Sequence, residues 1–503
     1  MCDAYSFHVT PSIRVLSMLL TQLLGPEISA PAGISRLFVT GLTADSRQVA
    51  PGFVFAAMPG VSVDGARFIG DAAARGAVAV LAAQDAAFPS DLKIPVLRAA
   101  NPRRALALMA ARFYPAQPEH VVAVTGTSGK SSVADFARQI FSSCGLRAAS
   151  LGTIGLVKPD GATYGSLTTP DPISLHRTLN DLAEEGVTHL SFEASSHGLD
   201  QHRLDGVRLS AAAFTNLGRD HMDYHASVED YFAAKLRLFT ELLRPGQYVV
   251  VNTDGAMSER VVDAARARGL WVMTVGRTGR VLRLVDLERD GFAQVMRIEA
   301  DGVTQPVRLP LIGAYQVENA LTAAAVAMSV GIDSGDVLGA LEKLTGVPGR
   351  LDRVGEVRGG LVVVDYAHKP EALRAALESV RPFVTGRLIC VFGCGGDRDK
   401  GKRPIMGRLA TEHADMVIVT DDNPRTEDPA SIRAQILADA PCALEIGDRK
   451  AAIDAAIGMM RPGDVVVIAG KGHETGQIVG NTVLPFSDHE VARSAILKEA
   501  GHD

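Results

Sequence analysis

A glycine-rich turn between an apolar run and a helical pattern is the part of this sequence best equipped for chemistry. Residues 120–132 read His-Val-Val-Ala-Val-Thr-Gly-Thr-Ser-Gly-Lys-Ser-Ser. The apolar, β-branched run Val121–Val124 predicts a buried strand. After the turn, apolar side chains recur at the spacing of one helix face, and we expect that helix to end at Gly145. The apolar positions are Val133, Phe136, Ala137, Ile140 and Phe141.

The order strand, glycine turn, Lys-Ser and helix is that of a phosphate-binding loop. Backbone N–H groups and the helix N-terminus attract phosphate oxygens, Lys130 adds a full positive charge, and the Ser131 hydroxyl can ligate Mg²⁺. Only two residues separate Gly126 from Gly129, whereas the usual loop has four. An ordinary turn is therefore the alternative, but the flanking strand and helix favour a nucleotide site.

Two further segments carry candidate ligands for a metal ion. Residues 189–198 predict a strand that ends at Glu193, where a Mg²⁺-holding acid lies in a phosphate-loop domain. A strand-end carboxylate facing solvent is the alternative. Residues 220–225 (Asp-His-Met-Asp-Tyr-His) place two acids and two histidines within six positions. Such a cluster indicates metal or phosphate binding, with a solvated loop as the simpler reading.

Two residues near or in predicted helices stay ambiguous. Lys235 lies in the amphipathic segment 231–239, where a lysine is usually a surface residue. Asn319 precedes an alanine-rich helix expected over residues 320–330. Its amide could hydrogen-bond the edge of a purine, but a helix cap is the stronger expectation from the residues alone.

Polar or glycine-rich loops follow four apolar strand candidates in the last third of the chain. The strand candidates are residues 361–365, 387–392, 416–420 and 464–469. The loops that follow are residues 365–370, 392–403, 421–425 and 470–474. In open α/β sheets, ligands bind at the carboxyl ends of the strands. We therefore expect a binding site here rather than a solvated face. The second loop also has four cations that could bind carboxylate or phosphate groups, namely Arg398, Lys400, Lys402 and Arg403.

Composition limits the class of protein. The chain has 503 residues, 47% of them hydrophobic, so we expect roughly two to four globular domains. A formal net charge of −6 gives no reason to expect a nucleic acid or a membrane as partner. Five scattered cysteines fit a reducing cytoplasm. No apolar run reaches the length of a membrane span, and residues 15–24 predict an amphipathic helix rather than a signal peptide.

Proline- and glycine-containing breaks divide the chain into three α/β domains. The breaks lie at residues 113–119 and near residues 346–349. The first domain is small and mixed, with strands expected at residues 76–82 and 93–97. The alternation of strands and helices predicts a mostly parallel sheet covered by helices in the central domain, which is of the phosphate-loop ATPase type. The last domain is predicted to be Rossmann-like.

These motifs, in this order along nearly the whole chain, resemble those of the Mur ligases, ATP-dependent amide-forming enzymes of peptidoglycan assembly. Residues 125–131 (Thr-Gly-Thr-Ser-Gly-Lys-Ser) are similar to the family's Thr-Gly-Thr-Asn-Gly-Lys-Thr. Ser128 and Gln316 replace asparagines that are usual in the family, and both keep a hydrogen-bonding side chain. The other matching segments are residues 193–198, 220–225, 365–368 and 395–404.

The resemblance implies three functional domains. Residues 1–118 would bind a UDP-linked substrate, residues 119–347 would bind ATP, and residues 348–503 would bind the incoming amino acid. Catalytic roles are implied for Lys130, Lys235 and His221, with Lys235 carbamylated by CO₂ so that it can ligate Mg²⁺. The implied metal ligands are Ser131, Glu193, His221 and Lys235. The implied ATP-binding residues are Gly126, Thr127, Ser128, Gly129, Lys130, Ser131, Ser132, Asn319, Arg350 and Asp365.

The resemblance also assigns residues to the other two substrates. For the UDP-linked substrate they are Ser46, Val61, Ser62, Val63, Thr168, Thr169, Ser195, Gln201 and Arg203. In the family, Asp-Asn-Pro-Arg, here residues 422–425, marks enzymes that add meso-2,6-diaminopimelate rather than lysine. Diaminopimelate has an extra ammonium–carboxylate centre, and a guanidinium can bind that carboxylate through two charge-assisted hydrogen bonds. The implied diaminopimelate residues are Arg398 and Arg425 for the carboxylate, Glu474 for the ammonium, and Asp422, Asn423, Pro424 and Gly470.

The implied reaction is a cytoplasmic ligation in the synthesis of cell-wall precursors, and so serves cell shape and division. The D-glutamate carboxylate of UDP-N-acetylmuramoyl-L-alanyl-D-glutamate would attack the γ-phosphate of ATP. The amine of diaminopimelate would then displace phosphate from the acyl phosphate. ATP, Mg²⁺ and the carbamate on Lys235 are the expected cofactors, and we expect a monomer without a nucleic-acid partner or a membrane span. A lysine-adding Mur ligase, a folylpolyglutamate synthase and a nucleotide-binding regulator are the alternatives.

Overall fold

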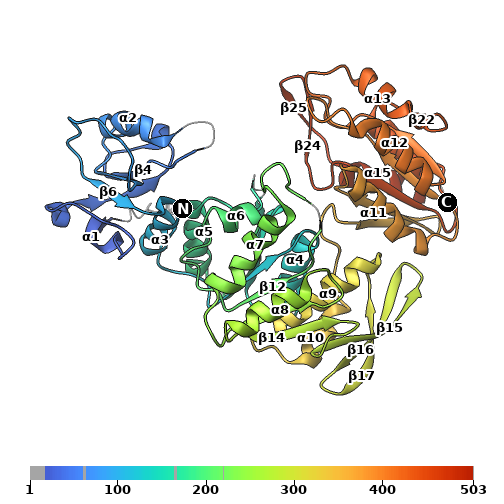
Figure 1. The fold of residues 1–503 in the computed structure, drawn as a ribbon. Coiled ribbons are helices and arrows are strands. Elements are labelled where there is room, and N and C mark those ends of the chain that lie inside the picture. The colour runs from blue at the N-terminus through green and yellow to red at the C-terminus, as the bar shows by residue number, and fades with distance from the viewer. Residues whose placement is uncertain (1–16, 61–63, 164–166, 219, 502–503) are drawn as a thin grey trace, which may run out of the picture. The chain divides into compact units, whose positions relative to one another are not determined.

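The computed structural model describes residues 17–60, 64–163, 167–218 and 220–501 (Figure 1). By their internal contacts these residues form two units. The first unit comprises the described residues up to 119 together with residues 169–187 and 196–208, and the second comprises residues 120–168, 188–195 and 209 onward. Within the described ranges, no helix is both long and apolar enough to cross a membrane.

A four-stranded parallel sheet forms the centre of the first unit. Its strands follow one another in chain order, namely β3 (Gly41–Thr43), β4 (Phe53–Ala56), β5 (Ala79–Ala83) and β6 (Val96–Ala99). The strands predicted at residues 76–82 and 93–97 are therefore confirmed, each starting three residues later. The helices of this unit include α2 (Ile69–Ala74), α3 (Pro102–Phe113), α5 (Pro172–Glu184) and α6 (Ser196–Asp200).

The amphipathic helix predicted over residues 15–24 is wrong in extent. In the described part, β1 (Met18–Leu19) pairs with β2 (Phe38–Val39), and α1 covers only Leu20–Leu23. Leu24 is already extended, and Gly25-Pro26 follows it. A helix stops here because proline lacks an N–H group and excludes the helical conformation from the residue before it.

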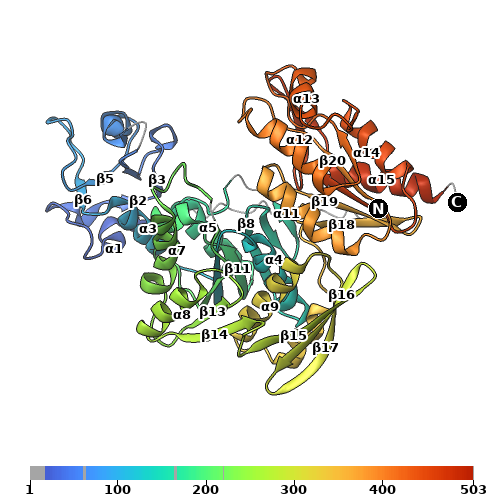
Figure 2. The ribbon, with the colours of Figure 1, turned by 45° about the vertical axis from the view of Figure 1, so that its right-hand side comes forward.

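An eleven-stranded sheet organises the first part of the second unit. Its central strands run parallel in the order β8 (Ala148–Gly152), β11 (His189–Glu193), β7 (His120–Thr125), β12 (Ala211–Phe214), β13 (Tyr248–Asn252) and β14 (Trp271–Gly276). This confirms the predicted parallel sheet. Both edges carry extensions with antiparallel strand pairs that the sequence analysis did not foresee. These are β9 (Gly155–Lys158) and β10 (Gly161–Thr163) at one edge, and β15 (Leu282–Asp290), β16 (Ala293–Ala300) and β17 (Val303–Leu309) at the other. Figure 2 shows the extension formed by β15, β16 and β17.

The helices of this part bury one face of the sheet. Val122 and Val124 lie two positions apart on β7 and therefore point to the same side, where they share a core with Phe136 and Ile140. The helices that contribute to this core are α4 (Lys130–Ser143), α9 (Ala314–Met328) and α10 (Ser334–Leu341). Two further helices are α7 (Val228–Arg237) and α8 (Ser258–Ala267). The helix predicted after the glycine turn is thus confirmed as α4.

A six-stranded sheet organises the last part of the second unit. Its order is β18 (Asp352–Val357), β19 (Gly360–Asp365), β23 (Val465–Ala469), β20 (Leu388–Phe392), β21 (Met416–Val419) and β22 (Leu444–Glu445), with only β18 antiparallel to its neighbour. The four strands predicted in this region are confirmed as β19, β20, β21 and β23. Their carboxyl ends therefore lie at one edge of the sheet, as the proposed binding loops require.

Helices cover both faces of this sheet (Figure 2). Leu361 and Val363 of β19 pack with one set of helices, whereas Val362 and Val364 pack with the other. The first set is α11 (Pro370–Val380), α12 (Lys402–His413) and α13 (Pro429–Leu437), and the second is α14 (Arg449–Gly458) and α15 (Asp488–Ala500). Because both faces are buried, the inner strands β20, β21 and β23 are apolar throughout, whereas the edge strands β18 and β22 carry exposed polar residues. The Rossmann-like prediction is confirmed, with an added hairpin of β24 (Gly476–Val479) and β25 (Thr482–Pro485).

Candidate active site

The glycine turn joins β7 to α4, and its backbone leaves no room for a side chain at its first glycine. Gly126 has a φ of +150°, and a Cβ there would lie 1.9 Å from the hydroxyl oxygen of Thr215. The Thr215 hydroxyl donates to the carbonyl oxygen of Ser128 at 2.6 Å. Asn216 holds the turn from the same side, since its backbone oxygen accepts from the N–H of Thr127 at 2.9 Å. The end of β12 thus fixes the shape of the turn.

Two lysine ammonium groups meet at one carbonyl oxygen of this turn. Lys130 Nζ donates to the carbonyl oxygens of Gly126 (3.0 Å) and Thr127 (2.8 Å), and Lys235 Nζ donates to that of Gly126 (2.7 Å). Burial lowers the pKa of Lys130. Burial, and then the charge of Lys130, lowers the pKa of Lys235 well below its ordinary value. The arrangement concentrates positive charge where a triphosphate would lie and favours a neutral amine at Lys235.

The expectation that Lys235 lies on the surface is wrong. Its side chain is only 1% exposed, and its Nζ lies 4.3 Å from the centre of the Tyr231 ring. Residues four apart share a helix face, so Lys235 follows Tyr231 into the interior. The phenol of Tyr231 in turn lies 3.1 Å from the hydroxyl of Thr127. This face of α7 therefore packs against the phosphate-loop candidate rather than against solvent.

Glu193 is buried, so the solvent-facing alternative is wrong. Its carboxylate, 1% exposed at the end of β11, accepts from the Ser131 hydroxyl (2.8 Å) and from the backbone N–H of Thr153 (2.7 Å). An acid and a hydroxyl are thus held together beside the turn, as a hard cation such as Mg²⁺ requires. His221, half-buried, lies on the loop after β12 with a φ of +55°, and burial lowers its pKa. Among the described residues, no group of three or more His, Cys, Asp and Glu forms a ready-made metal site.

The prediction of Asn319 as a helix cap is wrong. Helix α9 begins at Ala314, so Asn319 lies inside the helix, with Gly313 at the cap position. Its Nδ2 donates to Gln316 Oε1 at 3.1 Å, and a Cβ on Gly129 would lie 2.3 Å from its Oδ1. The polar residues before the alanine-rich stretch therefore belong to the helix, and they place Asn319 against the turn.

Asp365 and Arg350 lie at the start of the last sheet. The Asp365 carboxylate accepts from the backbone N–H groups of Leu351 (2.7 Å) and Ala367 (2.8 Å), and burial raises its pKa. The guanidinium of Arg350 lies 5.4 Å from the centre of the Tyr366 ring, within cation–π range. Asp365 thus fixes the loop after β19 and the segment that carries Arg350.

The strand-end loops of the last sheet enclose a pocket of about 910 Å³. Four loops contribute to it, following β19, β20, β21 and β23. Six residues assigned above to diaminopimelate line it, and Pro424 does not. The six are Arg398, Asp422, Asn423, Arg425, Gly470 and Glu474. Tyr366, His368, Lys369 and Lys402 also line the pocket. It therefore combines cations, carboxylates and an amide on one wall.

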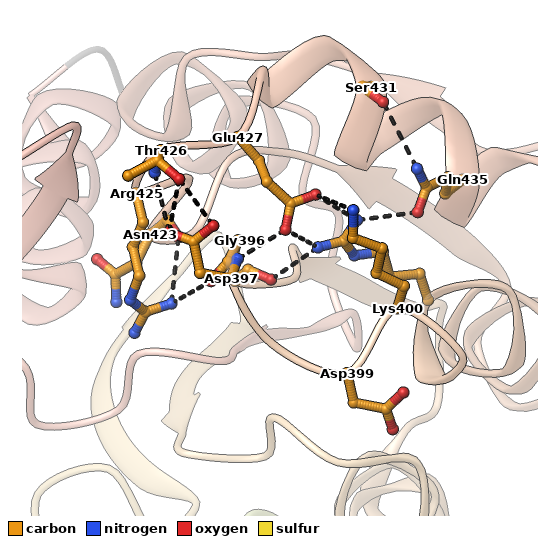
Figure 3. A network of polar contacts seen from close by, with 12 residues as sticks. Gly396, Asp397, Asp399, Lys400, Asn423, Arg425, Thr426, Glu427, Ser431 and Gln435 are labelled. Carbon is orange, nitrogen blue, oxygen red and sulfur yellow. Dashed lines mark hydrogen bonds and ion pairs between the residues drawn. The ribbon is translucent and has the colours of Figure 1, made fainter.

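The four cations of the loop after β20 have different roles. Arg403 is fully buried and binds both carboxylate oxygens of Glu427 (2.9 and 3.0 Å), and Lys400 lies 3.2 Å from the same carboxylate. Figure 3 shows the polar contacts around Glu427, which fix the loop after β20 to the segment that carries Glu427. The hydrogen bond from Arg403 holds the pKa of Glu427 at about 2.

Lys402 donates to the carbonyl oxygen of His368 at 2.7 Å. Arg398 is exposed and makes no hydrogen bond or ion pair within the described residues, so it is available to a ligand.

Arg425 is held by backbone oxygens beside the pocket. Its Nη1 donates to the carbonyl oxygen of Gly396 at 2.8 Å, and Figure 3 shows its guanidinium beside that loop. Its φ of +52° is unusual for a residue with a side chain. Its backbone pairs with the β24 hairpin, because its N–H donates to the carbonyl oxygen of Ile478 at 3.0 Å. The β24 hairpin therefore fixes the backbone of Arg425 in this unusual conformation, and the loop at Gly396 fixes its guanidinium.

Two buried cations behind the pocket were missed in the sequence. Lys471 is fully buried and pairs with Glu474 at 2.9 Å. Arg449 is fully buried and pairs with Asp488 at 2.7 Å. Arg449 also donates to the carbonyl oxygens of Ala469 (3.0 Å) and Asp421 (3.4 Å), which immediately precede two pocket loops. The only sequence signal was the position of Lys471 between two glycines of a strand-end loop.

Residues assigned to the UDP-linked substrate occur in both units. In the first unit, Ser46 begins a short turn that Asp45 caps, and the Arg203 guanidinium donates to the Thr169 carbonyl oxygen (2.6 Å) and to Gln201 Oε1 (2.8 Å). In the second unit, the Thr168 hydroxyl lies 3.0 Å from that of Thr153, and Ser195 follows the end of β11. The remaining three residues, Val61, Ser62 and Val63, lie outside the described residues.

Three family models match successive parts of the chain. The model described as "Mur ligase family, catalytic domain" matches residues 38–114. "Mur ligase middle domain" matches residues 124–327, and "Mur ligase, glutamate ligase domain" matches residues 349–472. The glycine turn and β11 fall within the middle model, and most of the pocket falls within the last.

Whole-chain comparisons agree with these models. A Bradyrhizobium diazoefficiens UDP-N-acetylmuramoyl-L-alanyl-D-glutamate–2,6-diaminopimelate ligase is 57% identical, covering 95% of this chain and 99% of its own. The Brucella melitensis protein of that name is 56% identical, covering 93% and 96%. A solved structure with the same description has a TM-score of 0.71 at 34% identity and covers 94% of this chain and 98% of its own. A Mycobacterium tuberculosis folylpolyglutamate synthase shares the fold, with a TM-score of 0.57 at 17% identity, covering 71% and 89%. This chain belongs to the Mur ligase family.

Proposed function

We propose that this chain is the ligase that joins meso-2,6-diaminopimelate to the D-glutamate of UDP-N-acetylmuramoyl-L-alanyl-D-glutamate, with hydrolysis of ATP. The observation that carries the proposal is the pocket at the strand ends of the last sheet. It presents Arg398 and Arg425 together with Asp422 and Glu474. A substrate whose far end carries both a carboxylate and an ammonium matches this combination of charges. Relatives that carry the name of this activity include one that is 57% identical over 95% of this chain.

ATP would lie on the glycine turn between β7 and α4. The ATP-binding residues would be 126–132, with Asn319 beside the turn and Arg350 and Asp365 from the start of the last sheet. Lys130 would leave the carbonyl oxygens that it contacts and neutralise the β- and γ-phosphates. Backbone N–H groups at the start of α4 would bind the remaining phosphate oxygens.

Mg²⁺ fits the donors beside the turn. Glu193 and Ser131 supply hard oxygen atoms, and His221 would add a nitrogen. Lys235 would supply oxygens only after carbamylation by CO₂, which requires a neutral amine. Its lowered pKa favours that neutral amine. The metal ions, when bound, would reduce the repulsion between the triphosphate and the attacking carboxylate.

The reaction would proceed in two displacements. A D-glutamate carboxylate oxygen attacks the γ-phosphorus, and ADP leaves with the bridging oxygen. The amine nitrogen of diaminopimelate then attacks the acyl carbon and loses a proton, and inorganic phosphate leaves with the former carboxylate oxygen. Lys130 stabilises the charge that builds on the transferred phosphoryl group, and the pocket holds the amine in position.

The domain functions follow from this assignment. Residues 1–118 would bind the uridine nucleotide with Ser46 and residues 61–63, and residues 119–347 would carry the ATP site. Residues 348–503 would carry the amine site. Thr168, Thr169, Ser195, Gln201 and Arg203 would contact the muramyl peptide and its phosphates. The substrates of such a reaction are cytoplasmic precursors, so we place the protein in the cytoplasm, as a monomer.

An amine-substrate panel tests the proposal. Phosphate release is measured with ATP, the UDP-linked dipeptide and either meso-diaminopimelate, lysine or glutamate. We expect turnover with diaminopimelate to exceed turnover with lysine by at least about a hundredfold, because lysine leaves the guanidinium groups unpaired. Faster turnover with lysine would make the chain a lysine-adding ligase. Oxygen-18 placed in the D-glutamate carboxylate should appear in the released phosphate, and its absence would exclude the acyl phosphate.

A further inference from the structure

Lys471 is a buried cation beside the proposed amine pocket. The site residues assigned above do not include it. It lies directly after Gly470, on the loop that follows β23, and its side chain is 0% exposed. Its Nζ donates to Glu474 Oε2 at 2.9 Å and to Asn423 Oδ1 at 3.0 Å. Both partners line the pocket. Burying an ammonium group costs free energy unless its partners are well placed. A buried lysine at this position therefore indicates a role for its charge.

Lys471 and the backbone N–H of Ile478 together fix the orientation of the Asn423 amide. Asn423 Oδ1 accepts from Lys471 Nζ and from the backbone N–H of Ile478 (2.9 Å). Both of these groups can only donate, so the atom that faces them must be the oxygen. The Nδ2 atom is thereby turned toward Glu474, to whose Oε2 it donates at 2.9 Å. An amide nitrogen has two hydrogens, and the second is left for a carboxylate in the pocket.

Lys471 also determines which oxygen of Glu474 meets a ligand. Glu474 Oε2 accepts from both Lys471 and Asn423, whereas Oε1 has no hydrogen-bond partner within the described part of the chain. Oε1 is therefore the acceptor left for an ammonium group. Burial raises the pKa of the neighbouring Asp422 carboxyl, and the charges of Arg449 and then of Lys471 oppose that effect, so Lys471 acts on two carboxylates. Without that cation the two negative charges would repel each other.

We propose that Lys471 is a positioning residue that sets the preference of the pocket for amine substrates with an ammonium and a carboxylate together at the far end. The inference rests on the proposed function of the same pocket. Lys471 presents a donor on Asn423 and an acceptor on Glu474 in a fixed order, which matches such a centre. Lysine offers only an ammonium, so it leaves the Asn423 donor unpaired. When Lys471 is lost, the backbone N–H of Ile478 alone holds the Asn423 oxygen and Glu474 loses its cation, so donor and acceptor are less firmly placed and this discrimination falls.

Three variants test the inference. Lys471→Met keeps the length of the side chain and removes its charge, and Lys471→Arg keeps the charge. Lys450→Met is the control, because Lys450 is an exposed lysine that also pairs with a carboxylate, that of Asp454. For each variant, kcat and KM are measured with meso-diaminopimelate, lysine and ATP. In Lys471→Met we expect the KM for diaminopimelate to rise about tenfold to hundredfold, with the KM for ATP unchanged. The ratio of kcat/KM for diaminopimelate to that for lysine should fall by at least about tenfold. The control should match the wild type.

The pH profile separates positioning from a structural role. Burial raises the pKa of Glu474, but the charge and hydrogen bond of Lys471, the hydrogen bond of Asn423 and the charge of His473 together outweigh burial, so the net pKa is lowered. In Lys471→Met the acidic limb of kcat/KM for diaminopimelate should therefore move to higher pH. In Lys471→Arg it should stay near its wild-type position. Adding Lys471→Met to Glu474→Gln should cause little further loss, since the pair acts together.

Two outcomes would overturn the inference without touching the ligase assignment. One is an equal loss with diaminopimelate and lysine together with an unmoved acidic limb. The other is a Lys471→Arg enzyme that folds, by its thermal unfolding midpoint, yet has lost the preference completely. Failure of the ligase assignment is distinguishable, because the wild-type enzyme would then not use diaminopimelate at all.

Discussion

The glycine turn and the proposed amine pocket would bind their ligands by different means. The turn is one continuous segment, residues 126–132, whose recognition groups are backbone N–H groups and the Lys130 ammonium. The pocket is assembled from four loops that follow β19, β20, β21 and β23, and side chains supply its recognition groups. Buried ion pairs such as Arg403–Glu427 support those side chains from behind. The proposed ATP site would thus depend on local backbone geometry, and the proposed amine site also on buried ion pairs that support the side chains lining the pocket.

The largest effect is expected at the turn. Lys130→Met should reduce turnover by about a thousandfold or more, because a full charge opposite the transferred phosphoryl group is lost. Phosphate release at saturating substrates measures it. Lys343→Met, a change at an exposed lysine, is the matched control and should match the wild type. Near-normal turnover in Lys130→Met would remove the phosphate-binding role from the turn.

A smaller, more selective effect is expected in the pocket. Arg425→Ala should raise the KM for diaminopimelate about a hundredfold and leave the KM for ATP unchanged, because only the bound carboxylate loses its partner. Steady-state kinetics with each substrate varied in turn measures both constants. Arg408→Ala, which removes an exposed arginine of α12, serves as control. Equal losses for both substrates would contradict the separation of the two sites.

A pair of glycine substitutions compares the sites directly. Gly126 and Gly470 both have positive φ (+150° and +117°), and a Cβ on Gly470 would lie 2.7 Å from Asp422 Oδ2. Gly126→Ala should raise the KM for ATP about tenfold or more, and Gly470→Ala should do the same only for diaminopimelate. If either substitution changed both constants alike, the sites would not be independent.

The smallest effect is a pH dependence at Lys235. Carbamylation needs the neutral amine, and the pKa of Lys235 is lowered by burial and then by Lys130. The neutral form is therefore populated above this lowered pKa, well below the value of about 10.4 for a free lysine. Bicarbonate should therefore restore activity to CO₂-depleted enzyme at a pH well below the pKa of free lysine. Restoration that appeared only near the pKa of free lysine would show that Lys235 is not activated.

The contrast explains what the sequence could reveal. The β7–turn–α4 layout was predicted because strand, glycines, Lys130 and helix follow one another within a short window. The strands β19, β20, β21 and β23 were predicted because burial on both faces makes them apolar throughout. Both patterns lie within short stretches of sequence. The elements that they predict form in the structure because the packing of neighbouring elements agrees with the local preference.

The roles of several side chains could not be predicted from the sequence around them, because their partners lie far away in the chain. Lys235 was expected at the surface because only the packing of α7 against the turn buries it. Asn319 was taken for a cap because the first turn of α9 carries polar residues. Arg403 looked like an anion-binding residue, but its partner Glu427 lies on another loop. The role of Lys471 depends on Asn423, which pairing between distant loops brings beside it.

The buried pair of Arg449 and Asp488 has a consequence for the newly made chain. Arg449 holds the carbonyl oxygens before two pocket loops, and its partner belongs to the last helix, α15. During synthesis the residues of the glycine turn are made long before Asp488, so Arg449 would gain this partner only after α15 has been made. The amine pocket would mature last, so an unfinished polypeptide would have no means of joining substrates.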